Sequence, residues 1–238
     1  MKNLKICGLV KTTLLDYPGH IAATVFLGGC NFRCPFCQNG DIVTGVLDAP
    51  EITYEELSAF LDRRAGILEG ICVTGGEPTL FPADLEELLY GIKERGYLVK
   101  LDSNGTRPDL LRRFAREGLI DYVAMDIKAA PENYSRACGI PISDIVMDRI
   151  RESVFWLKNQ DAADHEFRTT AVKGIHTAED FEQIADWLSG CRRYAIQDYA
   201  PSAGVIAPAG LSSFTRKELE AFARIVSPAA GSVLIRGI

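Results

Sequence analysis

Short apolar runs alternate with helical patterns from residue 21 nearly to the end of the chain. The runs are rich in β-branched and aromatic residues and are bounded by glycine or polar residues, which is typical of buried strands. They predict strands at Ile21–Leu27, Ile71–Thr74, Tyr97–Leu101, Tyr122–Ile127, Glu166–Val172 and Tyr194–Tyr199, with a final strand at Ser232–Ile235.

Helical patterns fill the intervals between these runs. The clearest apolar face is that of Leu85, Leu88, Leu89 and Ile92, which follow the i, i+3, i+4, i+7 spacing. Capping boxes, in which a threonine and a glutamate three residues later satisfy the first backbone amides, mark two helix starts. We predict helices from Thr53 to about Arg64, around Leu85–Ile92, from near Pro108, over Asp144–Lys158, and after Thr177 and Thr215.

Six β-then-α units predict right-handed crossovers and a parallel sheet, so the fold class is α/β. Six units are fewer than the eight of a closed TIM barrel, which leaves a partial barrel or a doubly wound sheet. No linker, repeat or low-complexity tract interrupts the pattern. We therefore expect one domain over residues 1–238, with 1–20 as an N-terminal extension, 21–200 as the core and 201–238 as a C-terminal helix and strand.

Composition limits the class of protein. Hydrophobic residues make up 47% of the 238 positions and charged residues 24%, so a substantial core can be buried. The 26 Lys and Arg against 32 Asp and Glu give a net charge of −6, which disfavours nucleic acid as a partner. No apolar run approaches the ~20 residues of a membrane span, and the first residues do not resemble a signal peptide. We expect a cytoplasmic protein without a membrane partner.

Cysteine or polar side chains directly follow four consecutive predicted strands. These are Cys30, the segment Gly75-Gly76-Glu77-Pro78, the segment Asp102-Ser103-Asn104-Gly105 and the segment Asp126-Ile127-Lys128. Because the carboxyl ends of parallel strands meet at one edge, we expect these side chains to form one site. Each also has a plain structural interpretation, such as a tight turn at the glycines or an ordinary ion pair between Asp126 and Lys128.

Three of the seven cysteines are clustered as C-x-x-x-C-x-x-C at Cys30, Cys34 and Cys37. Thiolates are soft ligands that suit zinc or iron–sulfur clusters. A structural zinc needs four protein ligands, and no fourth Cys or His follows at a usual spacing. Three thiolates can instead hold three irons of a 4Fe–4S cubane, although the spacing alone leaves zinc open. The scattered Cys7, Cys72, Cys138 and Cys191 are interpreted as small buried hydrophobic residues.

The cysteine loop, with the aromatic Phe36 before its last cysteine, resembles the hallmark of the radical S-adenosylmethionine (SAM) enzymes. The likeness runs from about residue 3 to at least residue 200. Residues 8–19 (GLVKTTLLDYPG) and 26–39 (FLGGCNFRCPFCQN) are similar to activating enzymes of glycyl radical proteins, most of all the anaerobic ribonucleoside-triphosphate reductase activating proteins. The resemblance implies a partial (β/α)6 barrel with parallel strands and outer helices.

The resemblance also implies cofactors and their ligands. One 4Fe–4S cluster would be held by Cys30, Cys34 and Cys37, with its fourth iron open to S-adenosylmethionine. The cosubstrate would be bound by Phe36, Gly75, Gly76, Glu77, Asp102, Ser103, Asp126, Lys128 and Arg168. In some relatives the two aspartates act through a monovalent cation. The alternative for Arg168 is a surface or strand-edge charge.

In one respect the sequence departs from the relatives. Some of them place a histidine after the sixth strand, where Gln197-Asp198-Tyr199 stands here, so the contact to the cosubstrate at that strand is in doubt. His20, His165 and His176 show no paired spacing. No side chain is expected to act as a catalytic acid or base, because the cofactor carries the chemistry.

The implied activity is reductive cleavage of S-adenosylmethionine, giving a 5′-deoxyadenosyl radical that takes a hydrogen atom from a glycine of a partner enzyme. Anaerobic ribonucleotide reductase is the favoured partner, and pyruvate formate-lyase or another glycyl radical enzyme is the alternative. Only Cys72 lies between Gln38 and Thr74, too few cysteines for a second cluster, so an external flavodoxin or ferredoxin would supply electrons. The partner is expected to contact Asp16–His20 and the segment after Tyr199.

The sequence alone does not exclude two other functions. One is a radical enzyme that acts on a small molecule, as in a deazaguanine-type ring contraction. The other is a zinc-stabilised binding module without catalysis, which metal content would distinguish, because it would hold zinc in place of iron and sulfide.

Overall fold

The structure of the chain is a computed structural model that describes residues 3–45 and 51–237. Within these residues one sheet contains eight strands whose spatial order follows the chain order, with β1 and β8 at its edges. The strands are β1 (Ile6–Thr13), β2 (Ala22–Leu27), β3 (Gly70–Gly75), β4 (Leu98–Ser103), β5 (Tyr122–Asp126), β6 (Asp164–Ala171), β7 (Cys191–Asp198) and β8 (Ala230–Arg236).

The strands from β2 to β8 are parallel, and β1 is antiparallel to β2. The predicted α/β class with parallel strands is thus confirmed. In a doubly wound sheet the strand order reverses at a switch point. Here the order runs from β1 to β8 without reversal, so each crossover continues in the same direction, as in an incomplete barrel.

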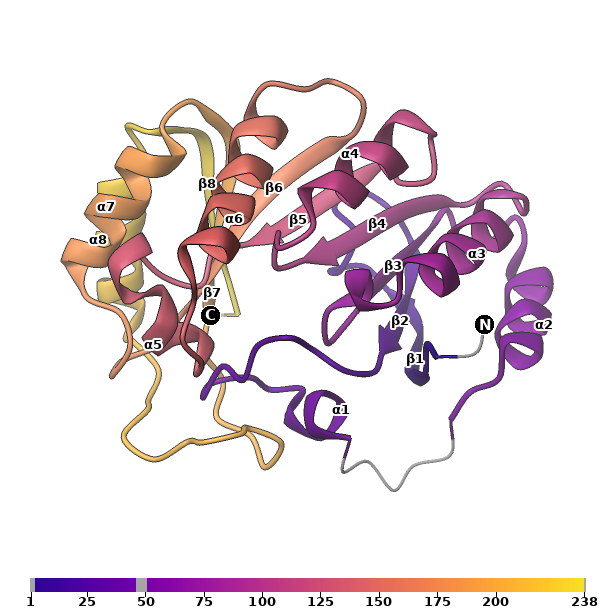
Figure 1. Cartoon of the computed structure of the whole chain (residues 1–238), viewed down its shortest axis with the longest axis horizontal. Coiled ribbons are helices and arrows are strands. Elements are labelled where there is room, and N and C mark those ends of the chain that lie inside the picture. Colours follow the sequence, from indigo (N-terminus) through magenta and orange to yellow (C-terminus); the bar gives the residue numbers. More distant parts are fainter. Residues whose placement is uncertain (1–2, 46–50, 238) are drawn as a thin grey trace.

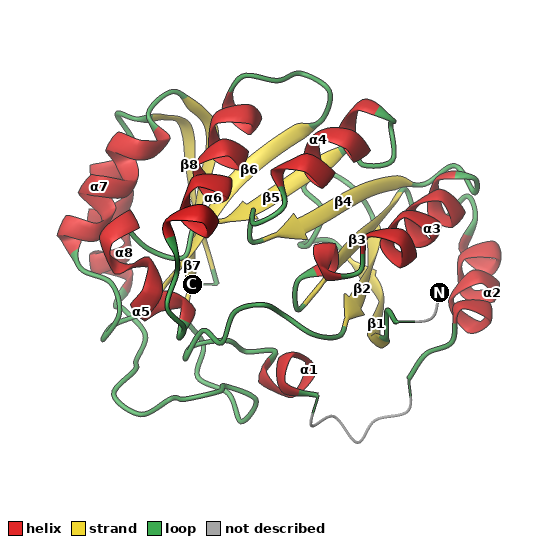
Figure 2. Cartoon of the chain, in the orientation of Figure 1, coloured by secondary structure: helices red, strands yellow, loops and turns green. Residues whose placement is uncertain are grey.

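Most of the helices lie around the outside of the curved sheet (Figures 1 and 2). They are α1 (Gly40–Thr44), α2 (Tyr54–Arg64), α3 (Pro82–Lys93), α4 (Pro108–Arg116), α5 (Tyr134–Cys138), α6 (Asp144–Lys158), α7 (Ala178–Leu188) and α8 (Arg216–Val226). Two 3₁₀ turns, Pro78–Leu80 and Pro131–Asn133, complete the described elements. None of the helices in the described ranges is long and apolar enough to span a membrane.

Period-two alternation along the strands separates the main core from the inner face of the sheet. In β5, Val123 and Met125 are fully buried in the core beneath the helices. Tyr122 and Ala124 point to the opposite face, where they pack in a small cluster with Tyr17. The inner face is therefore apolar at one end of the strands, and charged side chains occupy it near the carboxyl ends.

The predicted helices form where the caps place them. Thr53, Thr177 and Thr215 each accept a hydrogen bond from the backbone N–H three residues later, and each is part of a complete capping box. Such caps contribute about 0.5–2 kcal/mol each and set where a helix begins. The short helices α1 and α5 were not predicted, because five residues are too few to show a helical period.

The N-terminal extension holds a strand that the hydrophobic pattern does not show. β1 carries Lys11, Thr12 and Thr13 at its exposed end and lacks a regular alternation of buried and exposed positions. It forms because its backbone pairs with the buried β2. The pairing runs from Ile6 opposite Leu27 to Thr13 opposite Ala22, with two irregularities in the register. Of the proposed extension 1–20, residues 1 and 2 lie outside the described residues.

Candidate functional site

All twelve residues singled out from the sequence line one cavity at the carboxyl ends of β2 to β6. Eleven of them lie at or after the ends of four strands, β2 to β5, and Arg168 lies within β6, as expected if those ends meet at one edge of the sheet. The twelve are Cys30, Cys34, Phe36, Cys37, Gly75, Gly76, Glu77, Asp102, Ser103, Asp126, Lys128 and Arg168. Asn104, from a strand-end segment that was expected at the site, also lines the cavity. Six further lining residues were not predicted: Phe32, Gln38, Asn39, Val43, Thr74 and Thr170.

Backbone hydrogen bonds to distant segments hold the cysteine loop over this cavity. The N–H of Arg33 donates to the carbonyl of Cys138 at the end of α5, at 2.8 Å. On the other side, Pro35 accepts from the N–H of Ala207, and the N–H of Gly40 donates to Gly204. The loop between β7 and α8 therefore lies against the cysteine loop, as Figure 1 shows, and helps to fix its position.

The three clustered cysteines are free thiols. The N–H of Phe32 points at Cys30 Sγ, 3.4 Å away, as expected of a donor that would stabilise a thiolate. Burial raises the pKa of the Cys30 thiol to about 12. In the described ranges no three Cys, His, Asp or Glu side chains converge closely enough to hold a single metal ion. In a cubane cluster each cysteine binds its own iron, so its ligands do not meet at one point.

Two of the scattered cysteines have polar contacts near this site, although both are buried as expected. A hydrogen bond from the Cys138 thiol lowers the pKa of Cys34. The Cys72 thiol lies 3.7 Å from Asp102 Oδ1. Their interpretation as plain hydrophobic residues was therefore incomplete, and the missing information was the position of the partner side chains.

Gly75 and Gly76 allow the end of β3 to pack directly on the chain that leaves β2. Gly75 has a φ of +118°, in the region that favours glycine, and a Cβ there would lie 2.3 Å from the backbone nitrogen of Leu27. A Cβ on Gly76 would lie 1.7 Å from the carbonyl oxygen of Gly29. The sequence analysis interpreted these glycines as a tight turn or, by resemblance, as part of the cosubstrate site. In the structure, the chain's own backbone occupies the space that a side chain would need.

Glu77 ties two of the strand ends together. It is 2% exposed, and both of its carboxylate oxygens accept hydrogen bonds from the protein. Oε1 accepts from the N–H of Thr79 at 3.1 Å and from Ser103 Oγ at 3.0 Å, and Oε2 accepts from the N–H of Asn104 at 2.6 Å. Burial raises the pKa of Glu77, and these hydrogen bonds oppose the shift. Glu77 thereby fixes the end of β4 relative to the end of β3.

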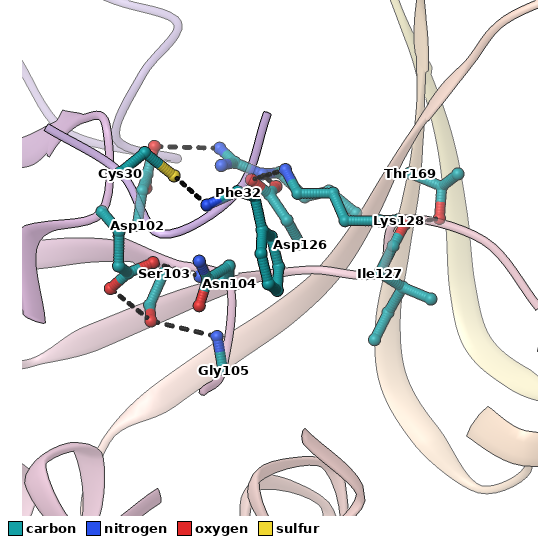
Figure 3. A network of polar contacts seen from close by, with 12 residues as sticks. Cys30, Phe32, Asp102, Ser103, Asn104, Gly105, Asp126, Ile127, Lys128 and Thr169 are labelled. Carbon is teal, nitrogen blue, oxygen red and sulfur yellow. Dashed lines mark hydrogen bonds and ion pairs between the residues drawn. The ribbon is translucent and has the colours of Figure 1, made fainter. Parts of the chain in front are cut away.

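A row of alternating charges crosses the inner face of the sheet beside the cavity. Figure 3 labels Asp102, Asp126 and Lys128 of this row. Asp102 accepts from Lys100 and, at 3.1 Å, from Arg168 Nη1. Asp126 accepts from Arg168 Nε at 2.8 Å and from Lys128 Nζ at 2.9 Å. We call these five residues, Lys100, Asp102, Arg168, Asp126 and Lys128, the charge row. Arg168, for which a surface charge was the alternative, lies at its centre with only 12% of its side chain exposed.

Mutual attraction keeps the charge row ionised despite its burial. Burial alone would raise the pKa of Asp126, but Arg168 and Lys128 hold it well below its ordinary value. Burial likewise opposes the charge on Arg168, yet the two aspartates hold its pKa well above the ordinary value. Removing one partner of such a buried pair typically costs about 3–5 kcal/mol, because the other charge is left uncompensated.

Lys100 was missed by the sequence analysis, and Asn104 was expected at the site only as part of the segment that follows β4. Lys100 stands two positions before Asp102 in β4, so both point to the inner face, and it is 1% exposed. That spacing was a usable signal. Asn104 donates through Nδ2 to Asn31 Oδ1 at 2.7 Å, which connects the end of β4 to the cysteine loop. This contact between residues 73 positions apart has no signal in the sequence.

A second cavity, of about 460 Å³, lies on the other side of the pair formed by Asp102 and Arg168. It is bounded by the connection between β1 and β2 and by the ends of β7 and β8, and its lining residues are Leu15, Asp16, Lys100, Asp102, Arg168, Gln197, Ile235, Arg236 and Gly237. Gln197, at the position where some relatives place a histidine, lies inside β7, one residue before its carboxyl end, and does not follow the strand. The structure places it in this second cavity, beyond the lining of the cysteine cavity.

The sequence matches the model of the radical SAM superfamily over residues 24–188. A relative from Methanocaldococcus jannaschii, named as a candidate glycyl-radical enzyme activating enzyme, is 34% identical over 84% of this chain and 82% of its own length. The 7-carboxy-7-deazaguanine synthase of Methanothermobacter thermautotrophicus is 36% identical over 47% of this chain and 42% of its own. The pyruvate formate-lyase-activating enzyme of Clostridium pasteurianum is 35% identical over 39% of this chain and 40% of its own.

Among solved structures, Streptococcus suis SuiB bound to S-adenosylmethionine superposes with a TM-score of 0.65 at 13% identity. The match covers 88% of this chain and 48% of SuiB, and at this identity it shows the shared fold. The fold, the cysteine loop at the end of its first parallel strand and the match over residues 24–188 agree. The chain belongs to the radical SAM superfamily.

Proposed function

We propose that this radical SAM enzyme is an activating enzyme that generates a glycyl radical on a partner protein. The observation that carries the proposal is the extent of its match to the Methanocaldococcus jannaschii relative, 84% of this chain and 82% of that one. The match to the Methanothermobacter deazaguanine synthase covers less than half of either protein, and a match to another such synthase that spans 74% of both proteins has only 27% identity. The likeness of residues 8–39 to activating enzymes favours anaerobic ribonucleotide reductase as the partner, with pyruvate formate-lyase as the alternative.

The donor set at the cavity fits a 4Fe–4S cluster. Cys30, Cys34 and Cys37 provide sulfur ligands on one loop, and all three thiols line the same cavity. The N–H of Phe32 is placed to donate to Cys30 Sγ, and such hydrogen bonds to sulfur tune a cluster. Burial raises the pKa of Cys37, and the ammonium of Lys128 opposes this rise, so Lys128 favours the thiolate form that binds iron.

S-adenosylmethionine would occupy the rest of the cavity, against Phe36, Gly75, Gly76 and the charge row. A reduced cluster held by Cys30, Cys34 and Cys37 would supply one electron to the sulfonium of S-adenosylmethionine, giving methionine and a 5′-deoxyadenosyl radical for hydrogen-atom abstraction from glycine. The protein's own residues bind, orient and exclude water. Glu77 and Ser103 hold the ends of β3 and β4 at a fixed separation. Phe36, which is only 5% exposed, contributes to the exclusion of water.

The first test is low-temperature EPR on anaerobically reconstituted, dithionite-reduced protein. We expect a reduced-cluster signal that changes when S-adenosylmethionine is added, followed by a glycyl doublet on purified anaerobic ribonucleotide reductase. A cluster signal that responds to S-adenosylmethionine without a doublet on any glycyl radical enzyme would contradict the activase proposal. Electron supply by flavodoxin or ferredoxin in place of dithionite is part of the same proposal.

The second cavity is the proposed entrance for the glycine of the partner. It shares Asp102 and Arg168 with the cysteine cavity, so this ion pair alone would separate a residue bound there from the proposed cosubstrate site. Its rim includes Leu15, which is 84% exposed, and the adjacent Leu14 is 70% exposed. Two leucines held in water beside an entrance favour a protein partner that covers them. They directly precede Asp16–His20, the stretch expected to contact the partner.

The double substitution Leu14→Glu and Leu15→Glu tests this entrance. We expect a roughly tenfold lower yield of glycyl radical at limiting partner concentration, because burying two carboxylates in the interface weakens binding by at least that factor. S-adenosylmethionine cleavage in the absence of partner should be unchanged. Phe155→Glu is the matched control, since Phe155 is 71% exposed on α6, outside both cavities. Equal losses in both variants would contradict the assignment.

The matches to 7-carboxy-7-deazaguanine synthases support a second candidate, a radical reaction on a small molecule. The two candidates predict different behaviour of the same variants. A small substrate would not depend on Leu14 or Leu15, and product would form without any protein partner.

A further inference from the structure

Asp102 and Asp126 have no carboxylate oxygen without a cationic partner. Asp102 Oδ1 accepts from the Lys100 ammonium, and Oδ2 accepts from Arg168 Nη1 at 3.1 Å. Asp126 Oδ1 accepts from Arg168 Nε at 2.8 Å, and Oδ2 accepts from Lys128 Nζ at 2.9 Å. Four oxygens thus face three positively charged side chains, and the guanidinium of Arg168 bridges the two aspartates.

This arrangement does not fit a monovalent cation at the two aspartates, which the resemblance to some relatives implied. An alkali cation binds several oxygen atoms at once, as hard cations do. Here each available oxygen already points at an N–H, and the space between the carboxylates is taken by a group that stays charged at any accessible pH. A second cation there would be repelled by the guanidinium and both ammonium groups.

We propose that Arg168 is a built-in substitute for that cation, a positioning residue that holds Asp102 and Asp126 together without a bound ion. The register of the strands explains why an arginine can take the place of the cation. Arg168 is the register partner of Asp126 across β5 and β6, so its Nε reaches the neighbouring strand directly. Its terminal nitrogen extends past β5 to Asp102 in β4. A guanidinium can bridge two carboxylates in this way because its donors are fixed in a planar fork, whereas an ammonium is a point charge.

The proposal concerns the cavity of the proposed function, but it is tested without S-adenosylmethionine. The thermal midpoint (Tm) of the reconstituted protein is measured in sodium, potassium and choline chloride at equal ionic strength. For the wild type we expect the same Tm in all three salts. Arg168→Met leaves two facing aspartates and opens the space between them. We therefore expect a lower Tm in choline that sodium or potassium raises by roughly 2 °C or more, since an ion that binds only the folded state stabilises it.

Arg236→Met is the matched control. Arg236 also binds a buried carboxylate on the inner face, that of Glu166, at 2.8 and 2.7 Å. Unlike Arg168, it does not bridge two carboxylates among the described residues. We expect this variant to lose stability equally in the three salts. A wild-type Tm that depends on sodium or potassium would overturn the proposal, and so would an Arg168→Met variant with no salt-specific recovery.

Arg168→Lys keeps the test open if the methionine variant does not fold. A lysine retains one positive charge but reaches only one aspartate, so we expect a reduced Tm with partial recovery in sodium or potassium. A lysine variant as stable as the wild type in choline would contradict the role of the two-armed guanidinium. Failure of glycyl radical formation in the EPR experiment would overturn the proposed function and leave these results unaffected.

Discussion

Replacing Cys30, Cys34 or Cys37 by alanine is expected to abolish cluster binding and reductive cleavage of S-adenosylmethionine. The structure places all three thiols on the lining of one cavity, and among the described residues no other cysteine lines it. Even changes to groups that only support a metal ligand cost 10–100-fold in affinity or activity, so loss of a ligand should exceed roughly 100-fold. Iron and sulfide content, together with the yield of 5′-deoxyadenosine, measure the effect.

Cys191→Ala is the matched control for these variants. Cys191 is also a free cysteine, 2% exposed at the start of β7, and does not line the cavity. Removing its thiol should leave the iron content unchanged. An alanine variant at Cys34 that retained a full cluster would contradict the ligand assignment, and one mole of zinc per chain in place of iron would favour the binding-module alternative.

Gly76→Ala is expected to have the second largest effect, although it removes no ligand. The new methyl group would lie 1.7 Å from the carbonyl oxygen of Gly29 and 3.3 Å from the nitrogen of Cys30. Backbone atoms cannot move aside as a flexible side chain can, so the first residues of the cysteine loop must shift. Overpacking of this kind costs typically 1–3 kcal/mol, and the displaced Cys30 should lower the iron content. Denaturant unfolding and iron analysis of the same preparation separate the two effects.

Gly8→Ala is the control for the added methyl group. At Gly8 in β1 a Cβ would contact Phe26 at an ordinary 3.6 Å, and no positive φ is involved. We expect less than about 1 kcal/mol of change in stability there, and full cluster content. If Gly76→Ala behaved like Gly8→Ala, the close contact between the ends of β2 and β3 would not be what positions the cysteine loop.

Local patterns were sufficient to predict most of the fold. Strands and helices were predicted from their periods, and threonine caps placed the starts of α2, α7 and α8, because these signals involve residues within a few positions of one another. The same holds for the cysteine motif, whose spacing and aromatic residue lie within eight positions. The short helix α5 and the strand β1 were not predicted, since neither has a local period and each depends on what it packs against.

Only the tertiary structure decided how the site residues act on one another. The sequence placed Asp102 and Asp126 at two strand ends and Arg168 within the next strand, but the register of β4, β5 and β6 decided that one guanidinium bridges both carboxylates. It also decided that Glu77 binds the end of the neighbouring strand and that Lys100 is buried beside Asp102. The physical reason is that a hydrogen bond or ion pair requires the atoms of residues far apart in the chain to be placed to within a few tenths of an ångström. Residue type and spacing along the sequence do not determine such distances.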